Sequence, residues 1–305
     1  MTKMVATKRR KLRKRIKLKY YNKVKYFEFQ DKAFKVFAIA CTLFGISVLL
    51  ALLVHVFSTG LGRIDWDFMT DGPSRKASSA GIYTAWIGTL WILVLTAVIA
   101  FPIGVGAAIY LEEYNKKSKL TNFLEINIAN LAGVPSIIYG LLGLELFSRM
   151  LHLGQSLLTG ALTLSLLILP VIIVSTREAL RTVPYSIREG SYALGASKWQ
   201  TIWNQVLPAS MSGIFTGVIL ALSRAVGETA PLIVIGALSY IRQPPSGILD
   251  SFTVLPIQIF DWVSRPQKEF SVNAAAAIII LLSITFIMNG VAVYLRHRWQ
   301  KKVKW

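Results

Sequence analysis

The sequence predicts an all-α integral membrane protein with six transmembrane helices and with both termini in the cytoplasm. Its composition points to a membrane, because 54% of the 305 residues are hydrophobic and the mean hydropathy is +0.53. A soluble domain with that balance would have too little polar surface to cover itself. Six stretches without Asp, Glu, Lys or Arg reach the length of about 20 residues that a helix needs to cross a bilayer. Basic residues also gather on one side of these stretches.

The six uncharged stretches are taken as the six helices, although each overshoots its helix by a few residues. The third is the shortest and is expected to run past Glu145 to about Phe147. The first is too long for a signal peptide and lacks the small-residue cleavage site of one. It is therefore expected to remain as a membrane helix. The stretches cover residues 36–62, 77–111, 126–144, 153–176, 199–223 and 271–295.

Lys and Arg fix the expected orientation. The segment before the first stretch, the second and fourth loops and the C-terminal tail together hold 26 of the 34 basic residues, whereas the 15 acidic residues divide 7 and 8 between the two sides. The whole formal net charge of +19 therefore lies on the side of the termini. Since basic residues are retained in the cytoplasm, both termini are predicted to be cytoplasmic.

The N-terminal arm, residues 1–35, is strongly basic and contains the run "KRRKLRKRIKLKYYNKVKYFEF". Such a run just before a membrane helix favours contact with anionic lipid, at about 1 kcal/mol per cation near the surface. Its aromatic residues suit the headgroup layer as well as they suit stacking on nucleic-acid bases. Because six membrane helices follow, we expect membrane lipid as the partner of this arm and no nucleic acid. The tail, residues 296–305, is also basic.

Several classes of chemistry are excluded. Cys41 is the single cysteine, so the chain forms no intramolecular disulfide and no cysteine-based zinc site. The three histidines are far apart and no HExxH pattern occurs, so no metal site is expected. The chain has no GxxxxGK[ST] loop for the phosphates of ATP. We therefore expect a chain without cofactor, metal or catalytic residues, which is not itself an enzyme.

The fifth loop, residues 229–270, is the longest and alternates apolar runs with proline and glycine. Apolar runs of ten to fourteen residues are too short to span, but they suit a re-entrant or interfacial segment. Two interpretations remain open. The loop either docks a soluble partner on the external side or covers the ends of the helices as a lid.

The fourth loop, residues 181–208, predicts two short helices joined by a glycine corner. Pro184 suits the first turn of the first helix, and Gly195 suits a left-handed residue that ends it. Ser197 and Gln200 have the spacing of a capping box that begins the second helix, and Pro208 marks the entry to the membrane. A plain connector between two spans is the alternative. A DNA-binding helix-turn-helix does not fit, because the neighbouring spans would block access to a duplex.

This loop resembles the EAA loop of ABC importer permeases. The pattern of that loop is Glu-Ala-Ala, three residues, Gly, nine residues, Ile, one residue and then Leu-Pro. The resemblance implies the type I ABC importer permease fold, with a permease domain over residues 81–295 that follows a first helix and external loop over residues 36–80. It also implies that residues 181–208 contact a separate ATPase subunit. Gln205 departs from the isoleucine of the pattern, and two small residues replace the alanines. The matching positions are Glu189, Gly190, Ser191, Gly195, Leu207 and Pro208.

Two further stretches are similar to the PstA-type permeases of the bacterial phosphate importer. They are "AGVPSIIYGLLGL", residues 132–144, and "SRAVGETAPLIVIGA", residues 223–237. The sister PstC-type permease typically lacks the Ala-Pro-Leu found here at residues 230–232, although a PstC-type chain remains an alternative. The resemblance implies a permease subunit for ATP-driven import of inorganic phosphate in the bacterial plasma membrane. It implies three partners: a PstC-type sister permease, PstB-type ATPase subunits and an external PstS-type phosphate-binding protein. An ion-gradient-driven secondary anion transporter is the alternative from another class.

Arg224 and Glu228 are the candidate substrate path. A charge at the bilayer centre costs about 2.5–3.5 kcal/mol, so such residues persist only when they pair or face protein or water. Their spacing of four predicts a shared helix face beside a stripe of small residues at positions 213, 217, 221 and 225. A salt bridge that locks two helices is one interpretation. A station where the guanidinium fork binds phosphate is the other, which the family resemblance favours.

The third stretch carries a second signal. Pro135 cannot donate a helix hydrogen bond and leaves the carbonyl of Leu131 without its partner, so a kink is predicted there. Gly133, Gly140 and Gly143 indicate either a route for substrate or close packing of a neighbouring helix.

Overall fold

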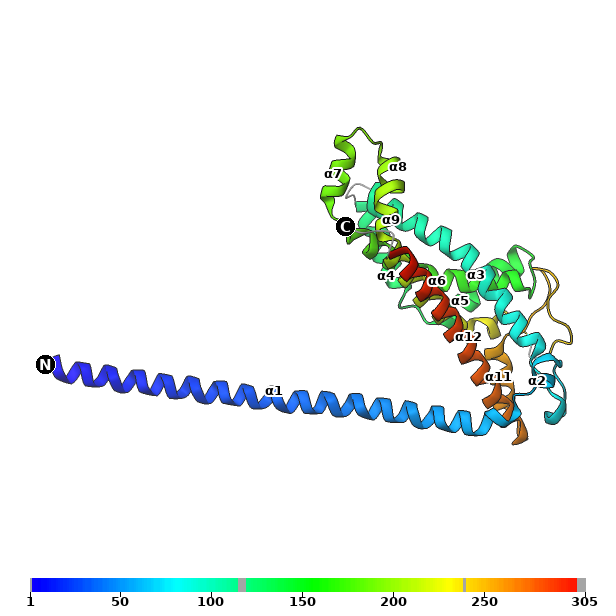
Figure 1. The fold of residues 1–305 in the computed structure, drawn as a ribbon, viewed down its shortest axis with the longest axis horizontal. Helices are drawn as coiled ribbons and strands as arrows, with labels where there is room; N and C mark the ends of the chain where they lie inside the picture. Colours follow the sequence, from blue (N-terminus) through cyan, green and yellow to red (C-terminus); the bar gives the residue numbers. More distant parts are fainter. Residues whose placement is uncertain (1, 115–118, 238–239, 301–305) are drawn as a thin grey trace. The chain divides into compact units, whose positions relative to one another are not determined.

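The computed structural model describes the backbone of residues 2–114, 119–237 and 240–300, and every regular element in this part of the chain is helical (Figure 1). The all-α prediction is therefore confirmed. Side chains are described from residue 26 onward, with a few later gaps. The side chains of residues 1–25, and with them most of the predicted lipid contact of the basic arm, lie outside the described residues.

Five continuous helical segments of the described chain are long and apolar enough to cross a membrane. The fourth continues without a break from the short helix α8 through a π-helical turn into α9. Each of the five overlaps one predicted stretch, and the second and third begin a few residues later than predicted. The helices that form them are α1 (Thr2–Gly60), α3 (Tyr83–Ile109), α6 (Leu157–Arg181), α9 (Leu207–Val226) and α12 (Glu269–Gln300).

The remaining predicted span, which is the third along the chain, is a broken helix. Its halves are α4 (Lys119–Leu131) and α5 (Ser136–Gly143), and the π-helical turn η4 (Leu144–Met150) continues the second half. The two apolar halves are bent by 102° at the break. Pro135 is the cause, because its backbone is extended and it lacks the N–H that would continue the helix. The predicted kink is thus confirmed as a full change of direction.

The chain divides into two compact units, Met1–Val56 and Phe57–Trp305. The first unit is a single helix, most of α1, whose apolar side chains from Phe34 to Val54 are almost all exposed. An exposed apolar surface of this kind suits a helix that is surrounded by lipid. The second unit holds all remaining elements and the whole core described below.

In the second unit α6 is the central helix, and it packs against α3, α5 and α9. Small residues allow these close contacts. A Cβ atom at Gly217 of α9 would lie 2.0 Å from the Ser175 Oγ of α6, and one at Gly143 would lie 2.0 Å from the Thr163 Oγ1. The small-residue stripe on α9 therefore faces α6, and Ala221 and Ala225 on it are buried. Close packing explains Gly140 as well, since a Cβ there would meet the backbone of Pro231.

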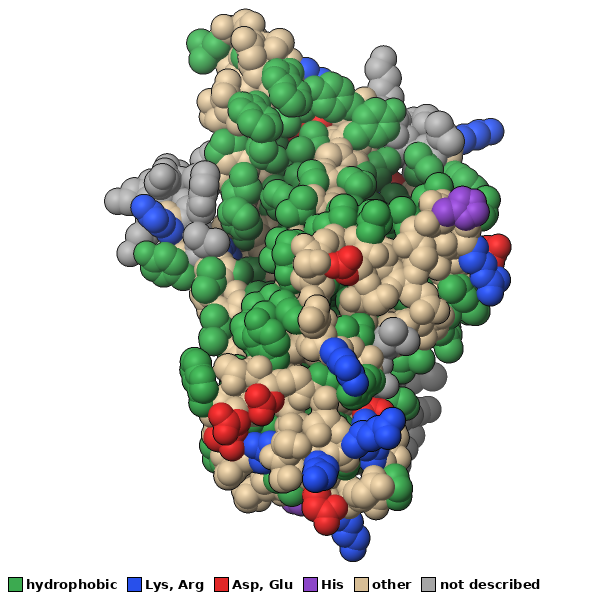
Figure 2. All heavy atoms as spheres, turned by 90° about the vertical axis from the view of Figure 1, so that its right-hand side faces the viewer, with side chains coloured by type: hydrophobic (Ala, Val, Ile, Leu, Met, Phe, Trp, Pro, Cys, Tyr) green, Lys and Arg blue, Asp and Glu red, His purple; other side chains and the backbone are tan. Residues whose placement is uncertain are grey.

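Most of the short elements lie toward the two ends of the second unit (Figure 1), whereas α10 (Ala230–Val234) packs against α5 and α6. We call the end that carries α7 and α8 the hairpin end, and the end that carries α2 and α11 the loop end. On the face shown in Figure 2, hydrophobic side chains cover the middle, and charged side chains gather toward the loop end. The short elements are η1 (Leu61–Arg63), α2 (Trp66–Thr70), η2 (Ala77–Ser79), η3 (Tyr110–Tyr114), α7 (Tyr185–Ala193), α8 (Lys198–Thr201), η5 (Ile202–Val206), α10 (Ala230–Val234) and α11 (Leu255–Val263).

The long fifth loop packs into the core at the loop end. Phe252 and Trp262 are almost completely buried. The Leu255 N–H donates to the Thr89 Oγ1 of α3 over 2.9 Å, and the Leu157 N–H at the start of α6 donates to the backbone oxygen of Asp250 over 2.9 Å. These contacts support the lid interpretation, because the loop supplies both hydrogen-bond partners and apolar cover to the helix ends.

Candidate functional site

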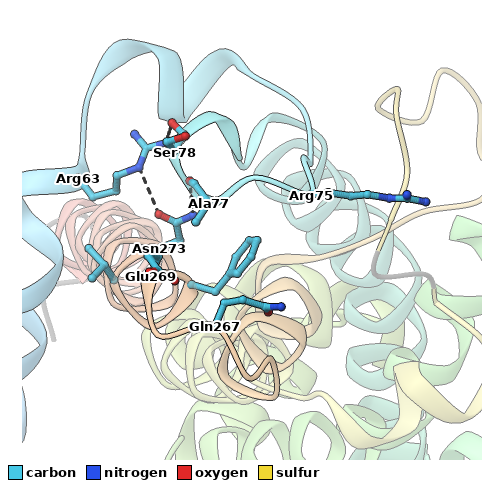
Figure 3. Close-up of a pocket in the computed structure, with 9 residues that line it drawn as sticks. Arg63, Arg75, Ala77, Ser78, Gln267, Glu269 and Asn273 are labelled. Carbon is cyan, nitrogen blue, oxygen red and sulfur yellow. Dashed lines mark hydrogen bonds between the residues drawn. The ribbon is translucent and has the colours of Figure 1, made fainter.

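A pocket of about 460 Å³ lies at the loop end between the 63–78 region and the start of α12 (Figure 3). Arg63 is its central cation, but each of its N–H groups already has an acceptor: Nε donates to Asn273, Nη1 to Asp65, and Nη2 to two backbone oxygens. Arg75 extends away from the other labelled side chains (Figure 3). Arg63 therefore ties the loops to α12 and has no donor left for an anion.

Arg224 and Glu228 do form an ion pair, but not on one helix face as predicted. The helix α9 ends at Val226, and Gly227 is its C-cap. The chain continues in a tight turn in which the Glu228 N–H donates to the Ala225 oxygen over 3.3 Å. This turn keeps the Glu228 carboxylate beside the helix end, where its Oε1 lies 3.3 Å from the Arg224 Nε. The Gly227 cap and the proline that follows at 231 end the helix sooner than a spacing argument predicts.

The pair leaves most of the guanidinium available. The Arg224 side chain is 41% exposed and that of Glu228 is 17% exposed. Only Nε has a hydrogen-bond partner among the described residues, so both Nη groups point to no acceptor there. Because its partner is four residues away on the same segment, this salt bridge does not lock two helices together. A guanidinium in this state can offer its planar fork to an oxyanion.

The surroundings of Arg224 include the helices α5 and α10 and the contact of α9 with α12. Tyr139 of α5 interacts electrostatically with Arg224, and its hydroxyl donates over 2.8 Å to the Leu131 oxygen, which also accepts from the Val134 N–H. Ser223 donates to the Asn289 Oδ1 of α12 over 2.6 Å. The short helix α10 packs against α5. The charged pair therefore lies where the broken third span and the end of α9 meet.

The helix–glycine–helix of the fourth loop is present as predicted. Gly195 has φ +83°, and the N–H groups of Gly195 and Ala196 donate to the oxygens of Tyr192 and Ser191, which is the hydrogen-bond pattern of a Schellman motif. Ser197 and Gln200 form the complete capping box at the start of α8. Pro184 is the N-cap of α7, one position before the predicted first turn.

The predicted coupling residues fall into two groups. Glu189 and Gly190 are exposed on α7, and the Ser191 hydroxyl lies 2.9 Å from that of Thr201, which joins the two short helices. Leu207 and Pro208 instead lie in the long helix α9 and are half-buried. Leu194, at the tip of the hairpin, is 91% exposed. Sequence reasoning did not single out Leu194, which directly precedes the glycine corner.

Sequence reasoning also missed Arg188, which ties the hairpin to the membrane helices. Arg188 is buried and donates to the Glu113 carboxylate of η3, with Nη2–Oε1 at 2.6 Å, and to the backbone oxygens of Val183 and Leu180 near the end of α6. Beside it, Arg177 and Arg181 of α6 both bind Glu112. The adjacent carboxylates Glu112 and Glu113 directly after an uncharged stretch were the available signal.

The hairpin also carries Tyr192, whose hydroxyl has a pKa different from that of a tyrosine in water. Burial raises the pKa of the Tyr192 hydroxyl, and the negative charge of Glu113 raises it further. Tyr192 is therefore uncharged at neutral pH and presents a polar but neutral group beside the Arg188–Glu113 pair.

Comparison with known proteins finds a matching family, several relatives and a solved structure of the same fold. The family model of the binding-protein-dependent transport system inner membrane component matches residues 100–301. The chain is 36% identical to the phosphate transport system permease protein PstA 1 of Mycobacterium tuberculosis, over 76% of this chain and 75% of that protein. It is 30% identical to the probable ABC transporter permease protein YqgI of Bacillus subtilis, over 81% of this chain and 91% of the relative. The MetNI methionine ABC transporter in an inward-facing conformation has the same fold, with a TM-score of 0.58, 17% identity and coverage of 70% of this chain and 94% of the other.

Proposed function

The chain belongs to the family of binding-protein-dependent transport system inner membrane components, and from this premise we propose that it is the PstA-type permease subunit of an ATP-driven phosphate importer. It is a multi-pass protein of the bacterial plasma membrane. The observation that carries the proposal is the 36% identity to a phosphate permease across three quarters of the chain. Neither a PstC-type chain nor a secondary anion transporter is favoured, because the phosphate permeases among its relatives include PstA proteins of several bacteria.

The hairpin end is proposed to face the cytoplasm. The basic residues of the second and fourth loops and of the C-terminal tail support this orientation, because cations are retained on that side. The loop end then faces outward, toward an external binding protein. The covered helix ends at the loop end suit that side, since a soluble protein would dock on folded loops rather than on bare helix ends.

Arg224 is proposed to be a transient station for phosphate. Its two free Nη groups match the geometry of two phosphate oxygens, and its exposed side chain suits a path that is completed by a second permease subunit. Binding at a station must be weak enough for release, so a single arginine suits conduction better than a full cage. Glu228 neutralises the guanidinium when the station is empty.

Coupling to ATP hydrolysis is proposed to run through the hairpin. The exposed tip at Leu194 and the exposed Glu189 and Gly190 would contact a PstB-type ATPase. Any displacement of α7 would act on Arg188, whose partners lie at the ends of α3 and α6. A Schellman motif ends α7 and a capping box begins α8, so hydrogen bonds hold the corner through which a displacement would pass.

The proposed partners follow the family. ABC permeases act with ATPase subunits and a substrate-binding protein, and we propose PstC-type, PstB-type and PstS-type proteins in these roles for this chain. The chain itself is a permease subunit, and ATP hydrolysis is proposed to take place on the ATPase. We propose no cofactor, metal ion or catalytic residue for this chain and no nucleic-acid partner, in keeping with the motifs that its sequence lacks.

Phosphate uptake into vesicles tests this function. The chain is reconstituted with its sister permease and ATPase, the binding protein is supplied outside, and uptake of labelled phosphate is measured with and without ATP. We expect uptake to require ATP and to survive collapse of the proton gradient. Uptake that continues without ATP, but stops when the gradient collapses, would identify a secondary transporter instead.

A further inference from the structure

An apolar groove of about 620 Å³ runs along the second unit near the hairpin end. One wall is the end of α3 with η3, and the other is α8, η5 and the start of α9. This groove is separate from the Arg224–Glu228 pair and from the exposed hairpin tip at Leu194, although Leu207, one of the predicted coupling residues, lines it.

The two ends of the groove differ in chemistry. Toward the middle of the membrane helices its lining is mostly aliphatic, with Val105, Met211 and Ile214, and it includes Phe101. Toward the hairpin end the lining is aromatic, with Tyr110 and Tyr114 on one wall and the stacked rings of Trp199 and Trp203, 5.5 Å apart, on the other. Tyr and Trp prefer the boundary between headgroups and hydrocarbon, so the aromatic end marks that boundary.

The length of the groove matches one membrane leaflet. Trp199 and Ile214 mark its two ends on the α8–α9 wall, and a rise of 1.5 Å per residue places them about 22 Å apart. Half of a bilayer with its headgroups measures roughly 20–22 Å. A single phospholipid that stands upright in one leaflet therefore has the length of the groove.

A cation without a carboxylate partner lies at the aromatic end. Lys198 Nζ lies 5.0 Å from the centre of the Tyr114 ring. Its neighbours Arg181 and Arg188 are paired with Glu112 and Glu113, whereas Lys198 forms no ion pair within the described residues. Lys198 therefore adds a positive charge beside the aromatic end, and this charge complements a phosphate group.

We propose that this groove binds one anionic phospholipid of the leaflet at the hairpin end. The acyl chains lie against the aliphatic lining, the glycerol region lies among the tyrosine and tryptophan rings, and the phosphate group lies near Lys198. A helix of a partner subunit would fill the aliphatic part equally well, but it would leave the cation and the aromatic end unexplained. The site is distinct from the lipid contact predicted for the basic N-terminal arm.

Quenching of tryptophan fluorescence by lipids with brominated acyl chains tests the site. The full chain is placed in phosphatidylcholine vesicles, and either brominated phosphatidylglycerol or brominated phosphatidylcholine is titrated in. The signal of the groove is the quenching that is lost in the Trp199→Phe/Trp203→Phe variant. We expect this signal to respond about fivefold more strongly to brominated phosphatidylglycerol, the preference that one cation near the surface gives.

Two variants separate the parts of the site. Lys198→Gln should remove the preference for phosphatidylglycerol but keep quenching by both lipids. Gly106→Leu should weaken quenching by both, because Gly106 lines the groove and a side chain there meets only open space. Gly290→Leu, also in open space but on α12, and Lys268→Gln, an exposed cation near the start of α12, are the matched controls.

Three results would overturn the proposal. The first is equal quenching by the two brominated lipids in the wild type. The second is a preference for phosphatidylglycerol that survives Lys198→Gln. The third is quenching that is present in the separate chain but disappears when the sister permease is added, because the groove would then belong to the partner subunit.

Discussion

Arg188 and Glu113 form a buried ion pair between α7 and η3, with Nε–Oε1 at 3.1 Å and Nη2–Oε1 at 2.6 Å. Their side chains are only 10% and 7% exposed. Arg188 also donates to the Leu180 and Val183 oxygens, so one side chain joins α7 to the ends of α3 and α6. Because this buried side chain holds three elements together, the position of the hairpin depends on the membrane helices.

Arg188→Met should destabilise the chain by about 3–5 kcal/mol, because it leaves the Glu113 carboxylate buried without a partner. Arg188→Met with Glu113→Gln should recover much of this loss, but ATP-driven uptake should remain low because the link is gone. Thermal unfolding of the purified chain and vesicle uptake provide the two measurements. Arg149→Met is the control, since its ion pair with Glu145 is exposed and should contribute no more than about 1 kcal/mol. A double variant with full uptake would contradict the link.

Gly195→Val should leave the chain inserted but impair coupling. The φ of +83° is unfavourable for a β-branched residue, and the left-handed conformation costs about 1–2 kcal/mol without glycine. We expect the hairpin to change shape, so that ATP hydrolysis no longer drives uptake. Gly290→Val is the matched control, because Gly290 is helical, lies on α12 outside the hairpin, and a Cβ there meets open space. Normal transport by an assembled Gly195→Val complex would show that the corner does not set the hairpin geometry.

Leu194→Asp should weaken binding of the ATPase subunit. Burying a leucine contributes about 1.5–3 kcal/mol, so affinity should fall roughly tenfold to hundredfold if the tip enters a groove on the ATPase. Titration of the ATPase against the permease complex in detergent measures this change. Leu249→Asp, a change of another exposed leucine, in the fifth loop, should have no effect. Equal affinities for the two variants would remove Leu194 from the contact.

Arg224→Lys should reduce phosphate uptake while assembly stays normal. Lysine keeps the charge but lacks the planar fork, and one lost charge-assisted hydrogen bond of about 1.5–3 kcal/mol corresponds to at least a tenfold lower rate. Arg149→Lys changes another arginine in an i,i+4 pair and should transport normally. Wild-type uptake by Arg224→Lys would mean that a point charge suffices. Failure of Arg224→Ala to assemble would return the pair to a structural role.

Glu228→Gln should relax discrimination against sulfate. An ionised carboxylate only accepts hydrogen bonds. It therefore repels sulfate but accepts a hydrogen bond from a protonated phosphate oxygen. The amide of glutamine can donate to sulfate. The measurement is competition by sulfate during phosphate uptake, in a system where the external binding protein does not limit selection.

Unchanged discrimination in an active Glu228→Gln complex would leave Glu228 with the counter-charge role alone. In that case Arg224→Gln with Glu228→Gln should assemble better than Arg224→Gln, because no unpaired charge remains.

The sequence was sufficient for the features that depend on local chemistry. Hydrophobic runs predicted the five continuous spans and the apolar segment that forms the bent pair, and the turn chemistry of Gly195 and Ser197 predicted the hairpin corner with its capping box. Pro135 predicted the position of the break in the third span. In each case a few neighbouring residues decide the backbone, so no knowledge of distant contacts is needed.

Features that depend on distant partners were not predicted. The burial of Arg188 is decided by Glu113, 75 residues earlier, and by the end of α6. The size of the bend at Pro135 depends on packing of α5 against α6 and α10, which spacing cannot supply. Glu228 was assigned to a helix face because spacing of four implies one, but the Gly227 cap ends the helix first.

The bend at Pro135 has a consequence for biosynthesis of the protein. Neither half of the third span, residues 123–131 or 136–150, is long enough to cross a bilayer alone. The surfaces that receive α5, at Thr163 and at Pro231, are synthesised later than α5 itself. The packing of α5 against these surfaces can therefore be completed only after ribosomal elongation has passed Pro231.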